Sequence, residues 1–322
     1  GHGTTTFREG LCNSCNPWFM HIGELLTVPT FCKYRDAFGF TSKTGIDLPG
    51  ESGSIYHDEE DMLPIDLAIE SFGQNFSITP IQMITACAAV ANGGYLVRPH
   101  VVDRVVDSRG NIVKSADTSY RRQVVSDKTS ATIADIMKQN AAAGTARGGY
   151  VSGYRICGKT GTSEKVAKHN EDLREDPNAQ MTYIASYCGF APAEDPKYAL
   201  LVFFDEPDGD ENGGFTGGNA VAGPIFSAMM QELLPYLGVE VEYGEDEHDQ
   251  RDMVTPTVVG MSITEAQAVL EEHGLKYSIV GDEENWENQV IEQIPESGSA
   301  VPKGGTVVLY SSGYGMDEAL VE

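Results

Sequence analysis

The 322-residue sequence is short of positive charge. It has 22 Lys and Arg residues against 48 Asp and Glu residues, so its formal net charge is -26. Proteins that bind nucleic acid need a basic surface that neutralises phosphates. We therefore expect no nucleic-acid partner, and we take the charge as a contribution to solubility that says little about the fold.

Long apolar runs are also missing. No stretch of about 18 or more apolar residues occurs, so we expect no membrane-spanning helix in this chain. The first ten residues, GHGTTTFREG, have neither the basic flank nor the apolar core of a signal peptide. We interpret the chain as the continuation of a longer polypeptide.

Metal-binding motifs are absent as well. The sequence has seven histidines without an HExxH pattern, and its six cysteines include a single CxxC, Cys12-Asn13-Ser14-Cys15. A zinc site of this type needs a second pair of ligands. We interpret the cysteines as ordinary buried thiols and expect no metal and no cofactor.

The sequence contains no Ser-x-x-Lys and no Gly-x-Ser-x-Gly, two motifs that present a serine nucleophile. Lys159-Thr160-Gly161-Thr162 nevertheless follows an alternating apolar run, and such a strand usually serves a Ser-x-x-Lys enzyme by binding a substrate carboxylate. Gly161 would let a ligand approach the backbone closely. A second copy, Lys43-Thr44-Gly45, lies in a glycine- and proline-rich segment and predicts a surface turn.

Ser14-Cys15-Asn16 is a second candidate motif. A serine hydroxyl can relay a proton, and an asparagine amide can orient a lysine and a substrate amide. One Ser-x-Asn is expected by chance in this chain, and Asn16 would equally suit the cap of a helix restarted by Pro17. The residues alone leave both readings open. If Ser14 and Asn16 face a cleft, the side chain of Cys15 should point away into packing.

The spacing of apolar residues changes from helical to alternating along the chain. The glycine- and proline-rich residues 38–53 predict a loop, and the charged residues 167–180 predict a second loop. Helical spacing predicts helices in 4–26 (interrupted at Pro17), 79–94 (capped by Thr79), 124–144 (capped by Ser126 or Asp127) and 220–237. Alternation predicts three antiparallel strands in 154–166, 181–192 and 197–207.

Composition divides the chain into four parts. Residues 1–238 mix helices with a sheet, 239–252 form an acidic linker, 253–313 form a small module, and 314–322 form a tail. The module should contain a helix from Thr264 to His273, closed by Gly274, and three short strands. We expect its core to include Val259, Ala266, Leu270, Val290, Ile291 and Val307.

These segments together resemble class B penicillin-binding proteins. The resemblance runs in order through GHGTTTFREGLCNSCNPWFMHIGE, FGFTSKTGIDLPGE, IESFGQNFSITPIQMITACAAVANGGYLVRPHVV, GTARGGYVSGYRICGKTGTSEK and YIASYCGFAPAEDPKYALLVFFDEP, and covers nearly all of 1–238. Residues 253–313 resemble a PASTA domain through VVGMSITEAQAVLEEHGL and QIPESGSAVPKGGTVVLYSSG. This combination resembles the sporulation-type or division-type enzymes of Gram-positive bacteria.

The resemblance implies an α+β fold, with a helical part beside a five-stranded antiparallel sheet, truncated at its N-terminal side and followed by a small α+β PASTA domain. It implies a peptidoglycan D,D-transpeptidase, whose serine attacks the D-Ala-D-Ala bond of a stem peptide and is trapped by β-lactams. The implied catalytic residues are Ser14 as proton relay, Asn16 as the residue that positions lysine and substrate, and Lys159. The implied substrate-binding residues are Thr160, Gly161 and Thr162, the last supplying half of the oxyanion hole through its N–H.

The sequence departs from the family pattern by the missing nucleophile. The family's Ser-x-x-Lys lies upstream of Ser-x-Asn, so we expect the nucleophile, the membrane anchor and the N-terminal pedestal before Gly1. The fragment alone should then be inactive. The implied location is the extracytoplasmic face of the cell membrane. The implied partners are peptidoglycan stem peptides, β-lactam antibiotics and, through the PASTA domain, muropeptides or division and sporulation proteins.

Two other functions are compatible with these motifs. One is a non-catalytic sensor domain that binds β-lactams or muropeptides at the same site. The other is a serine β-lactamase, which the PASTA-like module and the long interval between the two motifs disfavour.

Overall fold

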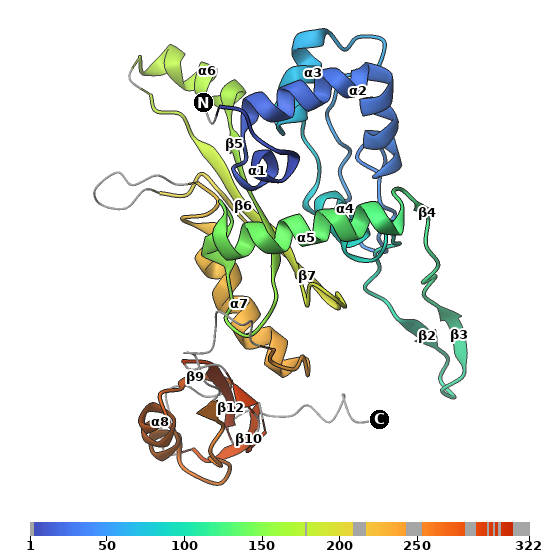
Figure 1. Cartoon of the computed structure of the whole chain (residues 1–322). Helices are drawn as coiled ribbons and strands as arrows, with labels where there is room; N and C mark the ends of the chain where they lie inside the picture. The colour runs from blue at the N-terminus through green and yellow to red at the C-terminus, as the bar shows by residue number, and fades with distance from the viewer. Residues whose placement is uncertain are drawn as a thin grey trace. The chain divides into compact units, whose positions relative to one another are not determined.

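The structure, a computed structural model, describes residues 3–177, 179–208, 217–242, 253–280, 288–294, 296–298, 300–301 and 304–311. The chain forms two compact units, one of residues 1–150 and 156–226, the other of 151–155 and 227–322 (Figure 1). Most of the expected linker, 243–252, and the whole expected tail lie outside the described residues. Among the described helices, none has the length and hydropathy needed to cross a membrane.

The first helical segment is split, as Pro17 predicts. Helix α1 (Phe7–Cys12) begins with a capping box in which Thr6 and Glu9 satisfy each other's backbone N–H groups. Helix α2 (Asn16–Ala37) carries Pro17 in its first turn. The cap of α2 is Cys15, which makes no side-chain capping bond, so the interpretation of Asn16 as a helix cap is wrong. The backbone of α2 also kinks at Thr27, close to Pro29.

The middle of the first unit contains three more helices, α3 (Pro64–Ser71), α4 (Pro80–Ala91) and α5 (Asp127–Ala143). Thr79 and Gln82 form a capping box on α4, and Ser126 caps α5, as the sequence predicts. Helix α3 had not been predicted. Four short strands lie between α4 and α5 and form two antiparallel pairs: β1 (Tyr95–Leu96) with β4 (Arg122–Gln123), and β2 (Arg104–Val106) with β3 (Ile112–Ser115).

The sheet of the first unit is antiparallel, in the order β5-β6-β7, with β5 (Cys157–Glu164) at one edge. Strands β6 (Tyr183–Ala191) and β7 (Tyr198–Asp205) complete it. The three predicted strands are confirmed. In the described residues the sheet has three strands and not the five that the resemblance implies, because no other described segment pairs with it.

Side chains of β6 alternate between the two faces of the sheet. Cys188 and Phe190 pack with the cluster formed by α4 and α5, which cross one face (Figure 1). Tyr187 is fully buried on the opposite face, where its ring lies 4.4 Å from that of Phe226 at the start of α7 (Ala222–Tyr236). Gly189 fits closely beside Phe226. The sheet is thus buried on both faces, while the edge of β5 remains available for a site.

The charged segment after β5 is a helix and not the predicted loop. Helix α6 (Val166–Glu175) follows Lys165 directly. It contains an i,i+4 ion pair, in which Lys168 donates to Asp172 at 2.8 Å. A high density of charge does not by itself indicate a loop, because Lys, Glu, Leu and Arg are good helix formers.

The second unit includes the module of 253–311. Helix α8 (Ile263–Glu272) starts with a capping box between Ser262 and Glu265. Three strands form a sheet in the order β10-β12-β9, namely β10 (Val290–Ile294), β12 (Thr306–Ser311) and β9 (Lys276–Val280). A two-residue antiparallel pair of β8 (Met253–Val254) and β11 (Ala300–Val301) completes the module. The 3-10 helix η1 (Arg147–Gly149) belongs to the first unit, where it follows α5.

The core of this module differs from the prediction at two positions. Ala266, Leu270, Val290 and Val307 are buried as expected. Val259 is 46% exposed and Ile291 is 42% exposed, so their assignment to the core is wrong. Adjacent residues in extended chain face opposite ways. Val258, before Val259, and Val290, before Ile291, are the buried residues. A bulge follows Val290 in β10.

Candidate active site

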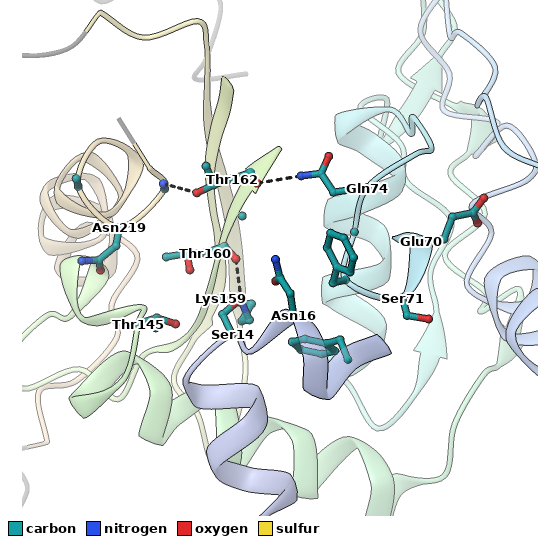
Figure 2. A pocket seen from close by; sticks show the side chains of 16 residues that line it. Ser14, Asn16, Glu70, Ser71, Gln74, Thr145, Lys159, Thr160, Thr162 and Asn219 are labelled. Carbon is teal, nitrogen blue, oxygen red and sulfur yellow. Dashed lines mark hydrogen bonds between the residues drawn. The ribbon is translucent and has the colours of Figure 1, made fainter. Parts of the chain in front are cut away.

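The predicted site residues line one cleft of about 680 Å³ in the first unit. All six, Ser14, Asn16, Lys159, Thr160, Gly161 and Thr162, contribute to its walls (Figure 2). They come from the junction of α1 and α2 on one side and from the edge strand β5 on the other. The second Lys-Thr-Gly, at 43–45, does not line this cleft. Gly45 has φ +74°, and its N–H donates to Glu51 at 3.0 Å.

Ser14 lies in the short connection between α1 and α2 in a left-handed backbone conformation, with φ +48°. This conformation costs a residue other than glycine about 1–3 kcal/mol and is found often at functional sites. Two backbone bonds hold the turn: Ser14 N–H donates to Leu11 O at 3.1 Å and Cys15 N–H to Gly10 O at 3.1 Å. Cys15 is buried and does not line the cleft, as the motif spacing predicts.

Lys159 reaches from β5 to Ser14. Its Nζ donates to Ser14 Oγ at 2.9 Å and to the carbonyl oxygen of Thr160 at 2.9 Å. Burial lowers the pKa of Lys159 from 10.5 to about 8, while the nearby Cys12 acts weakly in the other direction. No described carboxylate forms an ion pair with this amine. The lysine is therefore poised to exchange a proton near neutral pH.

The free edge of β5 presents backbone groups to the cleft. The carbonyl of Thr162 accepts a hydrogen bond from Gln74 Nε2 at 3.4 Å, so it points away from β6. In an antiparallel strand the N–H and C=O of one residue point to the same side. The N–H of Thr162 consequently faces the cleft, which is the orientation required of an oxyanion-hole donor.

Gly161 is required by the neighbouring strand. A Cβ at this position would lie 2.5 Å from Ser186 Oγ on β6. Gly218 also lies close to β5, because a Cβ at its position would be 2.5 Å from Gly161 O. Its N–H donates to Thr162 Oγ1 at 3.1 Å. The close approach of a ligand to the backbone at Gly161 stays a prediction.

Several cleft residues were not found from the sequence. Gln74 follows α3, in the stretch SFGQ, and binds both Thr162 O and Ser163 Oγ. Asn219 accepts from Gly148 N–H at 2.7 Å, and Thr145 donates to Cys12 O at 2.9 Å. The glycine before Gln74 indicates a tight turn in the sequence. No sequence pattern places these residues beside β5, because their contacts join positions far apart in the chain.

Comparison with known proteins agrees with this geometry. Residues 1–231 match the penicillin binding protein transpeptidase domain, and residues 253–313 match the PASTA domain. Stage V sporulation protein D of Bacillus subtilis is 35% identical over 316 residues, which are 96% of this chain and 46% of that protein. Peptidoglycan D,D-transpeptidase FtsI of Escherichia coli is 30% identical over 206 residues, 63% of this chain and 31% of that protein.

Solved structures show the same fold. Penicillin binding protein 3 of Mycobacterium tuberculosis, complexed with ampicillin, superposes with a TM-score of 0.64 at 22% identity, covering 74% of this chain and 53% of that one. The chain spans less than half the length of the curated relatives cited above. The α+β fold, the matched domains and the motifs gathered in the cleft lead to one conclusion: this chain belongs to the penicillin-binding protein transpeptidase family and carries a PASTA domain after its transpeptidase part.

Proposed function

We propose that this chain is the C-terminal portion of a serine-type peptidoglycan D,D-transpeptidase, whose nucleophile lies in a segment outside these 322 residues. The observation that carries the proposal is the 2.9 Å bond from Lys159 Nζ to Ser14 Oγ, which joins two motifs 145 residues apart in one cleft. The absence of Ser-x-x-Lys from the sequence supports the second half of the proposal.

Ser14 relays a proton in this proposal. Because Ser14 Oγ accepts from Lys159, its own O–H is free to donate into the cleft. The acceptor is the nitrogen of the D-Ala that leaves when the acyl-enzyme forms. Lys159 then returns a proton to Ser14. A lysine with a pKa of about 8 is roughly one-tenth neutral at pH 7, so both protonation states of Lys159 are populated.

The residues that line the cleft indicate which groups of the substrate it would bind. Thr160 and Thr162 offer hydroxyls on β5 to the terminal carboxylate of a stem peptide, and Asn16 offers its amide from the opposite wall (Figure 2). The N–H of Thr162 stabilises the oxyanion. β-Lactams enter the same cleft as analogues of the D-Ala-D-Ala end.

The cellular setting is part of the proposal. The family resemblance supports work at the extracytoplasmic face of the membrane, anchored through a segment outside this chain. The PASTA domain would contact muropeptides or division or sporulation proteins. The name of the Bacillus relative supports the sporulation role more directly than the division role.

The test compares this chain with a longer gene product that includes the segment preceding residue 1. Both are incubated with a fluorescent penicillin and analysed by intact mass. We expect no adduct on the chain alone, because loss of the nucleophile typically removes about a millionfold in rate. The longer protein should carry one adduct, on a serine outside the 322 residues.

The matched variants are Lys159→Ala and Lys128→Ala in the longer protein. Lys128 is exposed on α5 and outside the cleft. Acylation should slow about hundredfold or more in the Lys159 variant, which is the usual size of a lost proton relay, and stay unchanged in the Lys128 variant. A stoichiometric adduct on any residue of the present chain would refute the proposal.

A further inference from the structure

A second cavity, of about 560 Å³, lies in the first unit and shares no lining residue with the active-site cleft. Its walls are the 43–47 loop, the segment around 98–105, the end of β3 and the residues that follow it. Five of the chain's 22 lysines and arginines line it, namely Lys43, Arg98, Arg104, Lys114 and Arg121, against two carboxylates. In a chain of net charge -26, such a concentration of cations is a local feature that composition does not explain.

The walls of this cavity are fixed by protein contacts. Asp47 accepts hydrogen bonds from the N–H groups of Val101 at 2.8 Å and Val102 at 2.9 Å, which ties the loop to the opposite wall and lowers the pKa of Asp47. Glu51 accepts from both the N–H and the hydroxyl of Thr44, at 2.6 and 2.7 Å. The cavity is therefore formed before any ligand binds.

The carboxylates near the cavity neutralise only part of its charge. Asp117 pairs with Arg98 at 3.2 Å, and Asp103, outside the lining, pairs with Arg104 at 3.5 Å. Both oxygens of Asp47 are used by backbone N–H groups. Lys43, Lys114 and Arg121 form no ion pair in the described part of the chain, and the carboxylate of Glu51 acts on Lys43 and Arg121 only through its charge.

Arg121 is the least exposed of these three cations. It is half-buried, and its backbone N–H donates to Leu96 O at 2.8 Å, but no described residue accepts a hydrogen bond from its guanidinium. Burial lowers the pKa of Arg121, and the positive charges of Arg122 and Arg98 lower it further, against a weaker opposite influence of Glu51. A guanidinium held among like charges has five donors available to a ligand.

We propose that this cavity binds a multivalent oxyanion, a ligand that carries phosphate or carboxylate groups, with Arg121 as its anchor. Guanidinium groups match the geometry of both anions through paired N–H donors, and the lysines add charge without fixed geometry. Binding would offset the repulsion among the unpaired cations. Nothing in the chemistry of the active-site cleft requires this second site.

The experiment is calorimetric titration of the chain with inorganic tripolyphosphate and, separately, with citrate, both at fixed ionic strength. We expect saturable binding of at least one probe. Arg121→Gln should weaken it about tenfold or more, the size of one hydrogen bond to a charged group. Comparison of the two probes assigns the site to phosphate or to carboxylate ligands.

The control is Arg109→Gln, which removes the same charge from the turn between β2 and β3. Arg109 is exposed and does not line the cavity. It should leave affinity within about twofold, with unchanged thermal unfolding in both variants. Lys114→Gln serves as a second lining variant should Arg121→Gln fold poorly, and it should also weaken binding. The proposal is overturned if the parent chain binds neither probe saturably, or if Arg109→Gln weakens binding as much as the lining variants.

Discussion

Lys159 holds its amine out of water beside a neutral hydroxyl and a backbone carbonyl. Both partners are acceptors, but neither is a full negative charge. The two hydrogen bonds therefore compensate the cost of burial only in part, and burial lowers the pKa of Lys159 to about 8. The arrangement lets the lysine donate and accept protons near neutral pH. It also lowers the free energy of unfolding while the buried amine is protonated.

The lowered pKa of Lys159 predicts that the free energy of unfolding depends on pH. The pKa of Lys159 is 10.5 in the reference state and about 8 in the fold, so between these values the unfolded chain binds more protons. The free energy of unfolding should then rise with pH in that window, by about 1.4 kcal/mol for each pH unit. Below about pH 8 the penalty is constant.

The measurement is urea unfolding of the parent chain and of Lys159→Met at several values between pH 7 and pH 10. The difference between the two should change in favour of the parent chain as pH rises above about 8. Lys128→Met, which removes an exposed lysine, should give a difference that is flat over the same range. Parallel curves for the parent chain and Lys159→Met would contradict the lowered pKa.

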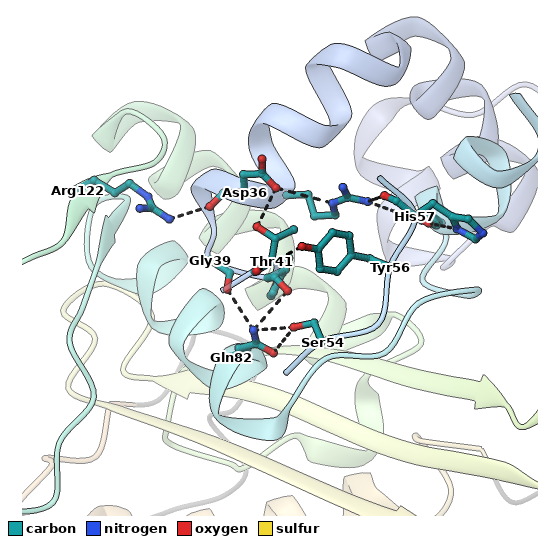
Figure 3. A network of polar contacts seen from close by, with 11 residues as sticks. Asp36, Gly39, Thr41, Ser54, Tyr56, His57, Gln82 and Arg122 are labelled. Atoms are coloured by element: carbon teal, nitrogen blue, oxygen red, sulfur yellow. Dashed lines mark hydrogen bonds and ion pairs between the residues drawn. The ribbon is translucent and has the colours of Figure 1, made fainter. Parts of the chain in front are cut away.

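At the scale of elements, α4 is joined to the long loop before α3 by one buried side chain (Figure 3). Gln82 is 2% exposed, and its Nε2 donates to the carbonyl oxygens of Ser42 at 2.9 Å and Gly39 at 3.3 Å. Its Oε1 accepts from the N–H of Thr79 at 2.8 Å, within the capping box. A single amide thus completes the helix start and anchors a segment that has no regular structure of its own.

We expect Gln82→Ala to lower the free energy of unfolding by about 2–4 kcal/mol. The substitution leaves the buried carbonyl of Gly39 and the partly buried carbonyl of Ser42 without this donor and removes half of the capping box, and both effects are costly. The measurement is urea unfolding at neutral pH. Gln123→Ala is the control, because Gln123 is exposed and water can replace its bonds to Gly93 and Asp127. A loss equal to that of the control would show that the loop is held by other contacts.

A second polar cluster connects α2 and α3. Glu70 has a fully buried side chain, and its two oxygens accept from Arg35 at 3.3 Å and contact His57 at 2.9 Å. The hydrogen bond to Glu70 raises the pKa of His57. The stabilisation from this contact is present below the pKa of unfolded histidine and is lost as pH rises through the higher folded value. Removal of Arg35 or His57 would leave one oxygen of the buried Glu70 carboxylate without its hydrogen-bond partner, which is costly in a buried site.

At the scale of the whole molecule, the small module has a hydrophobic core of its own, within 253–311 around Leu270 and Val307. In the first unit, buried apolar residues pack on the sheet β5-β6-β7 under α4 and α5, and a further cluster contains Cys32, Met62 and Leu67. A module of about 60 residues buries little apolar surface, so its own stability should be modest. Residues 239–252, which join the two parts in the sequence, are acidic and lack apolar periodicity.

Limited proteolysis tests this division. We expect the first cut between Val239 and Arg251, because polar segments without apolar periodicity are preferred sites of cleavage. Endoproteinase Glu-C suits the segment, which contains Glu240, Glu242, Glu245 and Glu247. Mass spectrometry should then show two resistant products, one on each side. A first cut within 253–313, with the acidic segment intact, would argue against separate folding.

Local chemistry made several features predictable from the sequence. Capping by Thr79 and Ser126, the restart at Pro17 and the alternation that forms β5, β6 and β7 each depend on neighbours in the chain. The two motifs around Ser14 and Lys159 were recognisable for the same reason, because each is a short run of residues.

Tertiary structure decided the rest, because it depends on contacts between distant residues. The sequence could not show that Lys159 donates to Ser14, that Gln74 completes the edge of β5, or that Val258 and not Val259 faces the module core. It also could not show that Arg121 lies among cations from separate segments. Periodicity and caps are set within a few residues, whereas burial, pKa shifts and the gathering of like charges arise only when the folded chain removes side chains from water.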